Sequence, residues 1–268
     1  MSDTSKSAGK VYIVGAGPGA DDLITLRGLH AVQQAEVILY DALMPATLLD
    51  QAPPDAERIY VGKRCGRHSM KQEEITLLLL AKAGEGKIVV RLKGGDPLIF
   101  GRGGEEALAC AEAGVDFEIV PGVSAVLGVA AFAGIPLTHR GVSSSVAFVT
   151  AHGAHSGESP DLSWINVAKA VETLVIFMGS AWLEKIATAL VESGLPATRP
   201  VAVVSNATCE SQKTVLGTLD TIVRQVAQAG LPTPMLIIVG EVTQLSEALN
   251  WFKRQREAAC VPVLSGSP

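Results

Sequence analysis

Aromatic side chains are scarce in this sequence. Phe, Trp and Tyr make up 4% of its 268 residues, although hydrophobic residues reach 48%. A core with so few aromatic residues must be built from aliphatic side chains and alanine, which is typical where helices cover both faces of a mostly parallel sheet. At roughly 100 to 200 residues per domain, the chain has room for one or two domains. We favour two, of the α/β class.

Positive charge and cysteine are also sparse. The net charge of -5 and the sequence pI near 5.6 exclude a broad basic surface, so we expect neither nucleic acid nor a membrane as a partner. Any basic cluster must be local. The four cysteines are widely separated and form no CxxC pair, so we interpret them as reduced thiols; they are Cys65, Cys110, Cys209 and Cys260.

Targeting signals are missing from the start of the sequence. The first ten residues, MSDTSKSAGK, are polar and lack the apolar segment of a signal peptide, which predicts a cytoplasmic protein. The longest uncharged run, residues 119–138, has the length of a membrane helix. Turn-forming residues interrupt it at Pro121, Gly122, Gly128, Gly134 and Pro136. We therefore expect a buried helix flanked by turns.

Short β-rich runs alternate with helical patterns along the chain, as in βα units that build a parallel sheet. Strands are expected at 11–15, 36–41, 58–62, 87–92 and 116–120, and then at 145–150, 173–178, 200–205, 213–217 and 235–240. Helices are expected at 22–34, 71–83, 103–113 and 121–134. The pattern predicts two α/β lobes with mostly parallel mixed sheets, at 1–121 and 122–252, followed by a loose tail at 253–268.

A glycine turn, VGAGPGA, follows the first expected strand. Gly15, Gly17 and Ala20 fit the dinucleotide pattern G-x-G-x-x-G/A, and Asp41 ends the next strand, where an acidic residue would contact a ribose. Taken alone, this arrangement favours a nicotinamide-dependent dehydrogenase.

Three residues in and after this turn oppose a phosphate ligand. Pro18 supplies no backbone N–H, and Asp21 and Asp22 place two carboxylates where the phosphate charge would lie. Carboxylates at that position cap a helix but repel a phosphate. The turn therefore suits a cofactor without phosphates, such as S-adenosylmethionine. The alternative is a tight strand-to-helix turn without a ligand.

A second loop rich in glycine, RLKGGDPLIFGRGGEE at 91–106, leaves a later strand. It combines the backbone freedom of several glycines with charged side chains, which is unusual in a passive connection. The charged residues among and beside its glycines are Lys93, Asp96, Arg102, Glu105 and Glu106. The two glycine-rich segments together predict a cofactor-binding enzyme.

These segments and several others resemble the motifs of a known family. The ordered motifs VGAGPG, YDAL, VGKRCGRHS, KGGDPLIFGRGGEE, VPGVSA and AGIPLTHR resemble those of the uroporphyrinogen-III C-methyltransferases, within the tetrapyrrole methylases, over residues 11–242. The resemblance implies two α/β lobes with the active site in the cleft between them, usually assembled as a homodimer. It implies transfer of two methyl groups from S-adenosylmethionine to uroporphyrinogen III, giving precorrin-2 by way of precorrin-1.

The resemblance also implies which residues contact the cofactor. They would be Pro18, Gly94, Gly95, Asp96, Ile99, Ser124 and Ala125 in the first lobe, with Met178 and Ala207 in the second. Family members often carry Thr-Ala where this chain has Ser124 and Ala125, and Gly where it has Ala207. These changes are small, so they bear on contact details and not on the identity of the cofactor.

Catalytic and substrate-binding roles follow from the same resemblance. Asp41 would be the proton acceptor and Lys63 the proton donor. Arg102, Glu105, Arg140 and Met178 would bind or orient the substrate, whose rim of carboxylates requires fixed cations. Because an arginine side chain normally keeps its proton, we expect Arg102 to act as an electrostatic anchor for the substrate and not as a base. Asp41 could instead only cap the turn that follows it.

Two basic or histidine-containing segments have simpler alternatives. The loop with Lys63 also holds Arg64, Arg67 and His68, and Arg64 and Arg67 could form a solvated face. His152 and His155 lie close in sequence but lack a third ligand at suitable spacing, so we expect a loop and no metal.

The alternatives to methyl transfer to uroporphyrinogen III are a methylase of a later precorrin, a nicotinamide-dependent dehydrogenase and a noncatalytic sensor of an adenosyl ligand. The resemblance implies a product that serves the synthesis of sirohaem, cobalamin or haem d1.

Overall fold

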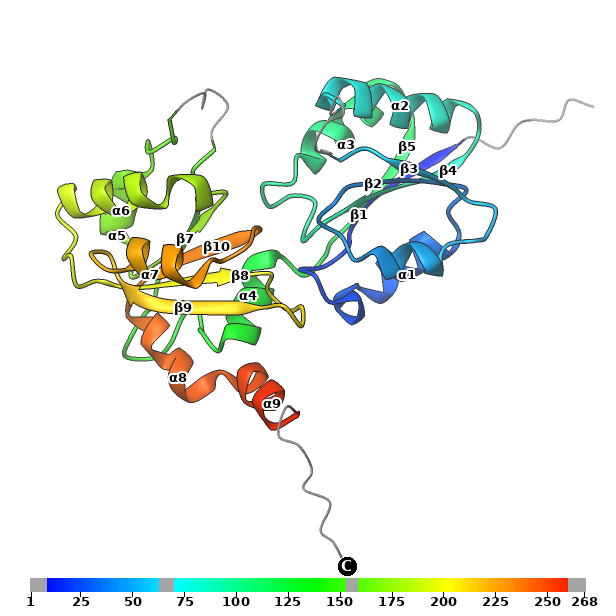
Figure 1. Ribbon diagram of the computed structural model, residues 1–268. Helices are drawn as coiled ribbons and strands as arrows, with labels where there is room; N and C mark the ends of the chain where they lie inside the picture. The colour runs from blue at the N-terminus through cyan, green and yellow to red at the C-terminus, as the bar shows by residue number, and fades with distance from the viewer. Residues whose placement is uncertain (1–8, 63–69, 153–158, 260–268) are drawn as a thin grey trace, which may run out of the picture. The chain divides into compact units, whose positions relative to one another are not determined.

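The computed structural model describes residues 9–62, 70–152 and 159–259, and the chain forms two compact units (Figure 1). Unit 1 is Met1–Ala125 and unit 2 is Val126–Pro268. Each unit contains a five-stranded sheet. The sequence pattern predicted the division between residues 121 and 122, in a Pro-Gly segment. The division in the structure follows a few residues later, after Ala125.

Unit 1 is built on a parallel sheet with the strand order β3-β2-β4-β1-β5. Its strands are β1 Lys10–Gly15, β2 Val37–Tyr40, β3 Glu57–Tyr60, β4 Ile88–Lys93 and β5 Asp116–Val120. The central strands are nearly continuous apolar runs because helices cover both of their faces.

Helices on the two faces of this sheet enclose two separate cores. The helical segments are η1 Asp21–Leu23, α1 Leu26–Gln33, η2 Ala46–Gln51, α2 Gln72–Gly84 and α3 Gly103–Glu112. Side chains of α1 and η2 pack with Val14, Ile38 and Val90 on one face. Those of α2 and α3 pack with Ile13 and Val89 on the other. Figure 1 shows α1 on one side of this sheet and α2 and α3 on the other.

The topology of unit 1 makes one end of the sheet a candidate ligand site. β1 and β4 are neighbours, yet the chain passes from β1 to α1 on one face and from β4 to α3 on the other. In open α/β sheets, ligands bind outside the carboxyl ends of strands where connections diverge in this way. The two glycine-rich segments of the sequence follow these two strands.

Unit 2 contains a mixed sheet with the order β6-β7-β10-β8-β9. Its strands are β6 Val146–Thr150, β7 Thr173–Phe177, β8 Pro200–Ser205, β9 Lys213–Thr218 and β10 Met235–Val239. β6 and β7 are parallel, whereas β10 pairs antiparallel with β7 and β8, and β9 pairs antiparallel with β8. With the four parallel pairings of unit 1, most strand pairings are parallel, so the predicted fold class is confirmed.

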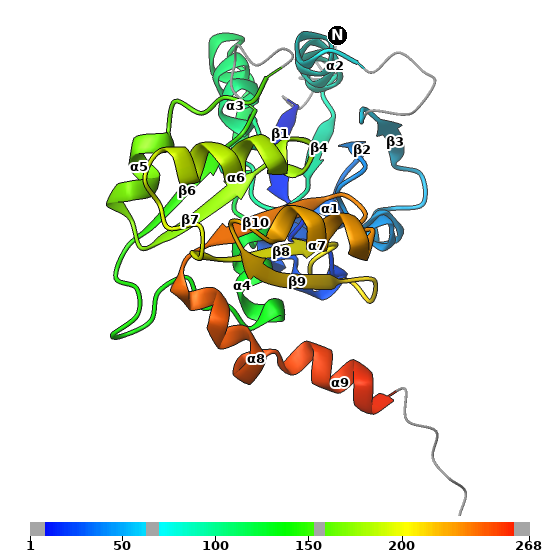
Figure 2. The ribbon, with the colours of Figure 1, turned by 60° about the vertical axis from the view of Figure 1, so that its left-hand side comes forward.

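Both faces of the unit 2 sheet are also covered. The helical segments are α4 Ala125–Ala133, α5 Ile165–Ala170, η3 Ser180–Trp182, α6 Leu183–Glu192, α7 Ile222–Ala229, η4 Glu241–Leu245, α8 Ser246–Leu249 and α9 Trp251–Ala259. α5, α6 and α7 contribute to one core, and α4 with η4 contributes to the other. Figure 2 shows α4 on the opposite side of the sheet from α6 and α7.

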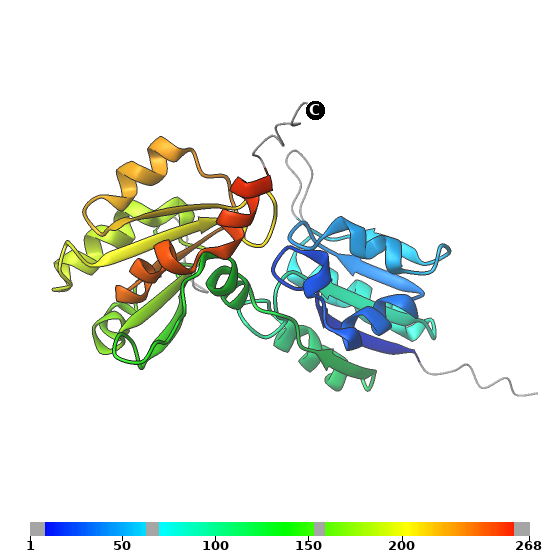
Figure 3. The same ribbon diagram turned by 90° about the horizontal axis from the view of Figure 1, so that it is seen from below.

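The expected loose tail at 253–268 is helical over its first residues, which corrects that prediction. The rings of Trp251 and Phe252 pack 5.0 and 4.9 Å from the Phe132 ring. Arg256 donates a hydrogen bond to the carbonyl oxygen of Gln212. In Figure 3, α9, in red, lies beside the yellow segment that leads into β9. These tertiary contacts stabilise α9 although its sequence is strongly polar. Residues 260–268 lie outside the described ranges.

The long uncharged run forms no membrane-spanning element. Within it, α4 occupies only nine residues. Among the residues that the structure describes, no helix is long and apolar enough to cross a membrane.

Candidate active site

The two glycine turns of unit 1 contact each other directly. Gly17 and Gly95 form an antiparallel bridge, with the Gly95 amide 2.7 Å from the Gly17 carbonyl oxygen and the reverse bond at 3.3 Å. The Ala16 amide also donates to the Lys93 carbonyl oxygen at 2.7 Å. Pro18, predicted to contact the cofactor, follows this bridge and is half-buried. The segments after β1 and β4 therefore form one backbone surface.

The segment after β5 joins this surface through glycine packing. A Cβ atom on Gly122 would lie 2.3 Å from the Gly95 carbonyl oxygen, and one on Gly15 would lie 2.6 Å from the Gly122 Cα atom. The Asp96 carboxylate accepts hydrogen bonds from the Gly122 amide at 3.0 Å and from the Leu98 amide at 2.9 Å. Three strand ends thus meet with no room for side chains between them.

The first helix begins later than the sequence pattern indicated. Asp21 and Asp22 open the 3-10 helix η1, whereas α1 begins at Leu26 and is capped by the Thr25 hydroxyl, which accepts from the Gly28 amide at 3.1 Å. The helix expected at 22–34 therefore begins only at Leu26, and the two aspartates lie in the first turn of η1. The helix N-terminus is also separated from the glycine turn, so its free amides are not presented there as in a dinucleotide site.

The other cofactor residues predicted in unit 1 lie around the same strand ends. A Cβ atom on Gly94 would lie 2.8 Å from the Leu43 Cβ atom, so this glycine permits close packing of the loop after β2. Ile99 is exposed, Ser124 is buried, and Ala125 begins α4.

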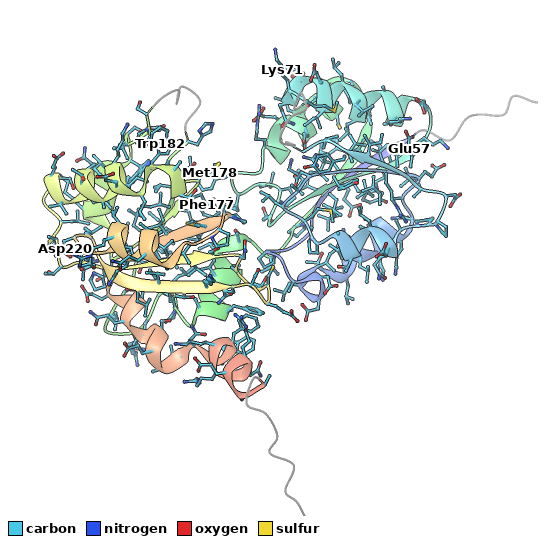
Figure 4. The ribbon with its side chains drawn as sticks, viewed as in Figure 1. Glu57, Lys71, Phe177, Met178, Trp182 and Asp220 are labelled. Carbon is cyan, nitrogen blue, oxygen red and sulfur yellow. The ribbon has the colours of Figure 1, made fainter. Side chains whose placement is uncertain are left out.

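The two cofactor residues predicted in unit 2 lie in loops of unusual backbone geometry. Met178 directly follows Phe177, the last residue of β7 (Figure 4). Its φ is 55°, and 47% of its surface is exposed. Ala207 lies between Asn206 and Thr208, whose φ values are 46° and 68°. Non-glycine residues in this left-handed region are uncommon and cluster at functional sites.

Asp41 has two partners at the carboxyl end of β2. Its Oδ1 atom accepts from the Leu43 amide at 3.0 Å, which is the turn-capping contact considered from the sequence. Its Oδ2 atom lies 3.4 Å from the Arg91 guanidinium. The carboxylate therefore caps a turn and also joins a charged network.

This network is buried in unit 1, and sequence reasoning missed most of it. Arg91 and Lys93 lie on one face of β4, and both contact Glu106 of α3 at 3.1 Å. Gln72 of α2 donates to the same carboxylate at 2.9 Å. Burial and the neighbouring Arg91 charge lower the pKa of Lys93, against the opposing effect of Glu106. The sequence signal that could have predicted this network is the presence of two cations on a strand that is otherwise apolar.

Arg102 and Glu105 form a bidentate ion pair at the start of α3. The guanidinium Nε and Nη2 atoms lie 2.8 and 2.7 Å from the two carboxylate oxygens. The hydrogen bonds raise the pKa of Arg102 and lower the pKa of Glu105. Both side chains are more than half exposed, so this pair presents a fixed positive group and a fixed negative group to solvent.

The remaining predicted residues are placed as follows. Arg140 is exposed in a turn of unit 2, next to the bridge between His139 and Ser143. Lys63, Arg64, Arg67 and His68 lie outside the described residues, as does His155. Within the described ranges, no group of three His, Cys, Asp or Glu side chains is arranged to hold a metal ion.

The architecture defines an α/β protein of two units whose glycine-lined strand ends in unit 1 suit an uncharged or cationic organic ligand better than a phosphate. Comparison with known proteins identifies the family. The model of the tetrapyrrole (corrin/porphyrin) methylases matches residues 10–223, and the chain belongs to this family.

Curated relatives are similar over nearly the whole chain. A siroheme synthase of Thiobacillus denitrificans is 48% identical over 95% of this chain and 53% of its own length. Siroheme synthase 1 of Pectobacterium atrosepticum is 51% identical over 91% of this chain and 50% of its own length. The chain thus spans about half the length of the curated relatives it matches.

A solved structure of similar size matches both units. Uroporphyrin III C-methyltransferase of Thermus thermophilus is 39% identical over 88% of this chain and 100% of its own, with a TM-score of 0.76, and has also been solved with S-adenosyl homocysteine. A cobalt precorrin-4 methyltransferase has a TM-score of 0.77 at 33% identity over 87% of this chain and 95% of its own.

Proposed function

We propose that this protein is a uroporphyrinogen-III C-methyltransferase dependent on S-adenosyl-L-methionine. It transfers two methyl groups to uroporphyrinogen III, giving precorrin-1 and then precorrin-2. Each transfer also releases one S-adenosyl-L-homocysteine. The observation that carries the proposal is the joined backbone surface formed by Gly17, Gly95 and Gly122, in a chain of this family.

The residues at this surface fit the proposed cofactor. Glycines let backbone amides and carbonyl groups approach an adenosine or a methionyl group closely, and Pro18 and Asp21 disfavour a pyrophosphate there. Asp96 is already bonded to two backbone amides, so its role is to hold the loop at 94–98 in place. Bound S-adenosylmethionine would supply an electrophilic methyl group.

The reaction needs alignment and the removal of one proton per transfer. The sulfonium–methyl bond breaks as a bond forms to an electron-rich pyrrole carbon, and the sulfur keeps the electron pair. A proton then leaves the methylated ring system. The protein therefore has to orient the two reactants, exclude water and hold a base near the ring.

We assign Asp41 as proton acceptor and Lys63 as donor, following the family resemblance. Asp41 is suited to this because it is ionisable, partly exposed and fixed by Leu43 and Arg91. Arg102, Glu105, Arg140 and Met178 would contact the substrate. The Arg102 guanidinium would bind a rim carboxylate, since its fork geometry matches that group.

The second candidate is a methylase of a later precorrin, and it is supported by the similarity to the cobalt precorrin-4 methyltransferase. Higher identity to the uroporphyrin III enzyme favours the earlier substrate. We further propose a cytoplasmic homodimer. The product would serve the synthesis of sirohaem, cobalamin or haem d1.

Two measurements test this function. Calorimetry should detect S-adenosylhomocysteine binding but no binding of NADH at the same concentrations. Methyl transfer should then be faster to uroporphyrinogen III than to precorrin-2. Binding of NADH alone would support a dehydrogenase, and faster methylation of precorrin-2 would support the later methylase.

A further inference from the structure

Glu106 is the most deeply buried charged side chain of the network behind Asp41. It has no exposed surface and lies in the first turn of α3, where a negative charge interacts favourably with the helix dipole. A buried ion network is weak evidence for a purely stabilising role, because an apolar cluster of similar volume is often at least as stable. Stability alone therefore does not explain why Glu106 is charged and buried.

The carboxylate of Glu106 holds two cations at once. Its Oε1 atom accepts from Gln72 at 2.9 Å, from Arg91 Nε at 3.1 Å and from Lys93 Nζ at 3.2 Å. Its Oε2 atom lies 3.1 Å from Lys93 Nζ. One anion thus fixes the positions of both basic side chains of β4.

Arg91 transmits this constraint to Asp41. Its Nη1 atom donates to the carbonyl oxygens of Leu39 and Leu92, at 3.3 and 3.0 Å, and its Nε atom is bonded to Glu106. The remaining Nη2 atom faces the Asp41 carboxylate at 3.4 Å. Every side of the guanidinium is therefore occupied, and its orientation is determined by its buried partners.

The network opens to solvent at Asp41. The side chains of Glu106, Arg91 and Lys93 are 0, 4 and 5% exposed, whereas that of Asp41 is 24% exposed. Among these four charged side chains, Asp41 is therefore the one able to meet a substrate. Lys93 forms the other end of the network. Its backbone carbonyl oxygen accepts a hydrogen bond from the amide of Ala16 in the first glycine turn.

We propose that Glu106 is a positioning residue for methyl transfer: it fixes Arg91, and Arg91 in turn orients the Asp41 carboxylate toward the reacting ring. This inference rests on the proposed function. It predicts that the effect of Glu106 appears in the rate of the chemical step and is lost when Arg91 can no longer reach Asp41.

The test is a double-mutant cycle with Glu106→Gln and Arg91→Lys. Lysine keeps the buried positive charge but cannot contact Glu106 and Asp41 together. Each single variant should lower kcat by about 10-fold or more while changing KM for uroporphyrinogen III and Kd for S-adenosylhomocysteine by less than about threefold. In the double variant, the second substitution should lower kcat by less than about twofold further.

Several results would overturn the proposal. Full kcat per folded molecule with only a lower thermal midpoint would show a structural role, and losses that multiply in the double variant would show that Glu106 acts independently of Arg91. If Glu106→Gln does not fold, Arg91→Lys decides alone: wild-type kcat in that variant contradicts the inference. The exposed carboxylate at the end of the same helix provides the control, since Glu112→Gln should leave kcat unchanged.

Failure of the proposed function is recognised separately. In that case wild-type protein would not methylate uroporphyrinogen III at all, whatever the behaviour of the variants.

Discussion

Gly17 and Gly95 exchange backbone hydrogen bonds across the carboxyl ends of β1 and β4, with N···O distances of 3.3 and 2.7 Å. Neither glycine turn is a complete ligand site by itself. Their pairing excludes side chains from the region between the strand ends, and packing of Gly122 against both segments extends this surface to β5.

Gly122→Ala should damage this surface. Its Cβ atom would lie 2.3 Å from the Gly95 carbonyl oxygen, a contact that only backbone movement can relieve. We expect S-adenosylhomocysteine affinity, measured by calorimetry, to fall by at least about 10-fold, together with a destabilisation of about 1–3 kcal/mol. Gly104→Ala is the matched control, because its Cβ atom meets nothing within 4 Å and lies in a helix. That variant should bind normally and be slightly more stable. Equal affinities in the two variants would contradict the account.

Asp96→Asn should loosen the loop that follows β4. The amide side chain offers one oxygen where the carboxylate offers two, so either the Gly122 or the Leu98 amide loses its acceptor. We expect a loss of about 1–3 kcal/mol in stability and weaker S-adenosylhomocysteine binding, measured by chemical denaturation and calorimetry. The exposed Asp50→Asn serves as the control. Unchanged binding after Asp96→Asn would remove this loop from the cofactor site.

Arg102→Ala should separate function from stability. Its ion pair with Glu105 is exposed, and such pairs contribute about 0–1 kcal/mol, so the thermal midpoint should change little. Loss of a charge-assisted bond to a substrate carboxylate should lower kcat/KM by about 10- to 100-fold, with S-adenosylhomocysteine affinity retained. Lys253→Ala, which removes another exposed ion pair, should leave kcat/KM unchanged. Full activity of the Arg102 variant would exclude an anchoring role.

Cys110 should resist modification in the folded protein. It is fully buried, and burial raises the pKa of its thiol from 9.0 to about 11. Iodoacetamide at pH 8 should label it only after unfolding, as followed by peptide mass spectrometry. Because the folded-state pKa is the higher one, this thiol favours the folded state fully below pH 9, and the contribution is lost as the pH rises toward 11. Rapid labelling of the native protein would contradict the described burial.

The strands of the fold were largely predictable because each contains a short run of β-branched, aromatic or other apolar residues close to turn residues. The start of α1 was not, since the choice between Asp22 and Thr25 as the first capped position depends on which side chain reaches a free amide. α9 was missed for a related reason. Its polar sequence contains no helical core pattern, and it depends on the contact of Trp251 and Phe252 with Phe132, which is distant in sequence.

The candidate site was predictable as a set of residue types but not as a network. Glycine content and the family resemblance pointed to the segments after β1 and β4. The sequence could not show that Glu106 reaches Arg91 and Lys93, because that contact depends on how α3 packs on the sheet. The roles of Asp41, Arg102 and the residues from unit 2 remain predictions.

The most direct test of the central claim is the stoichiometry of methyl transfer by the purified protein. Anaerobic incubation of uroporphyrinogen III with excess S-adenosylmethionine carrying a labelled methyl group, followed by mass spectrometry, counts the methyl groups on the product. We predict two labelled groups per macrocycle and two equivalents of S-adenosylhomocysteine. An unlabelled macrocycle with no S-adenosylhomocysteine formed would contradict the assignment of this protein as the methyltransferase.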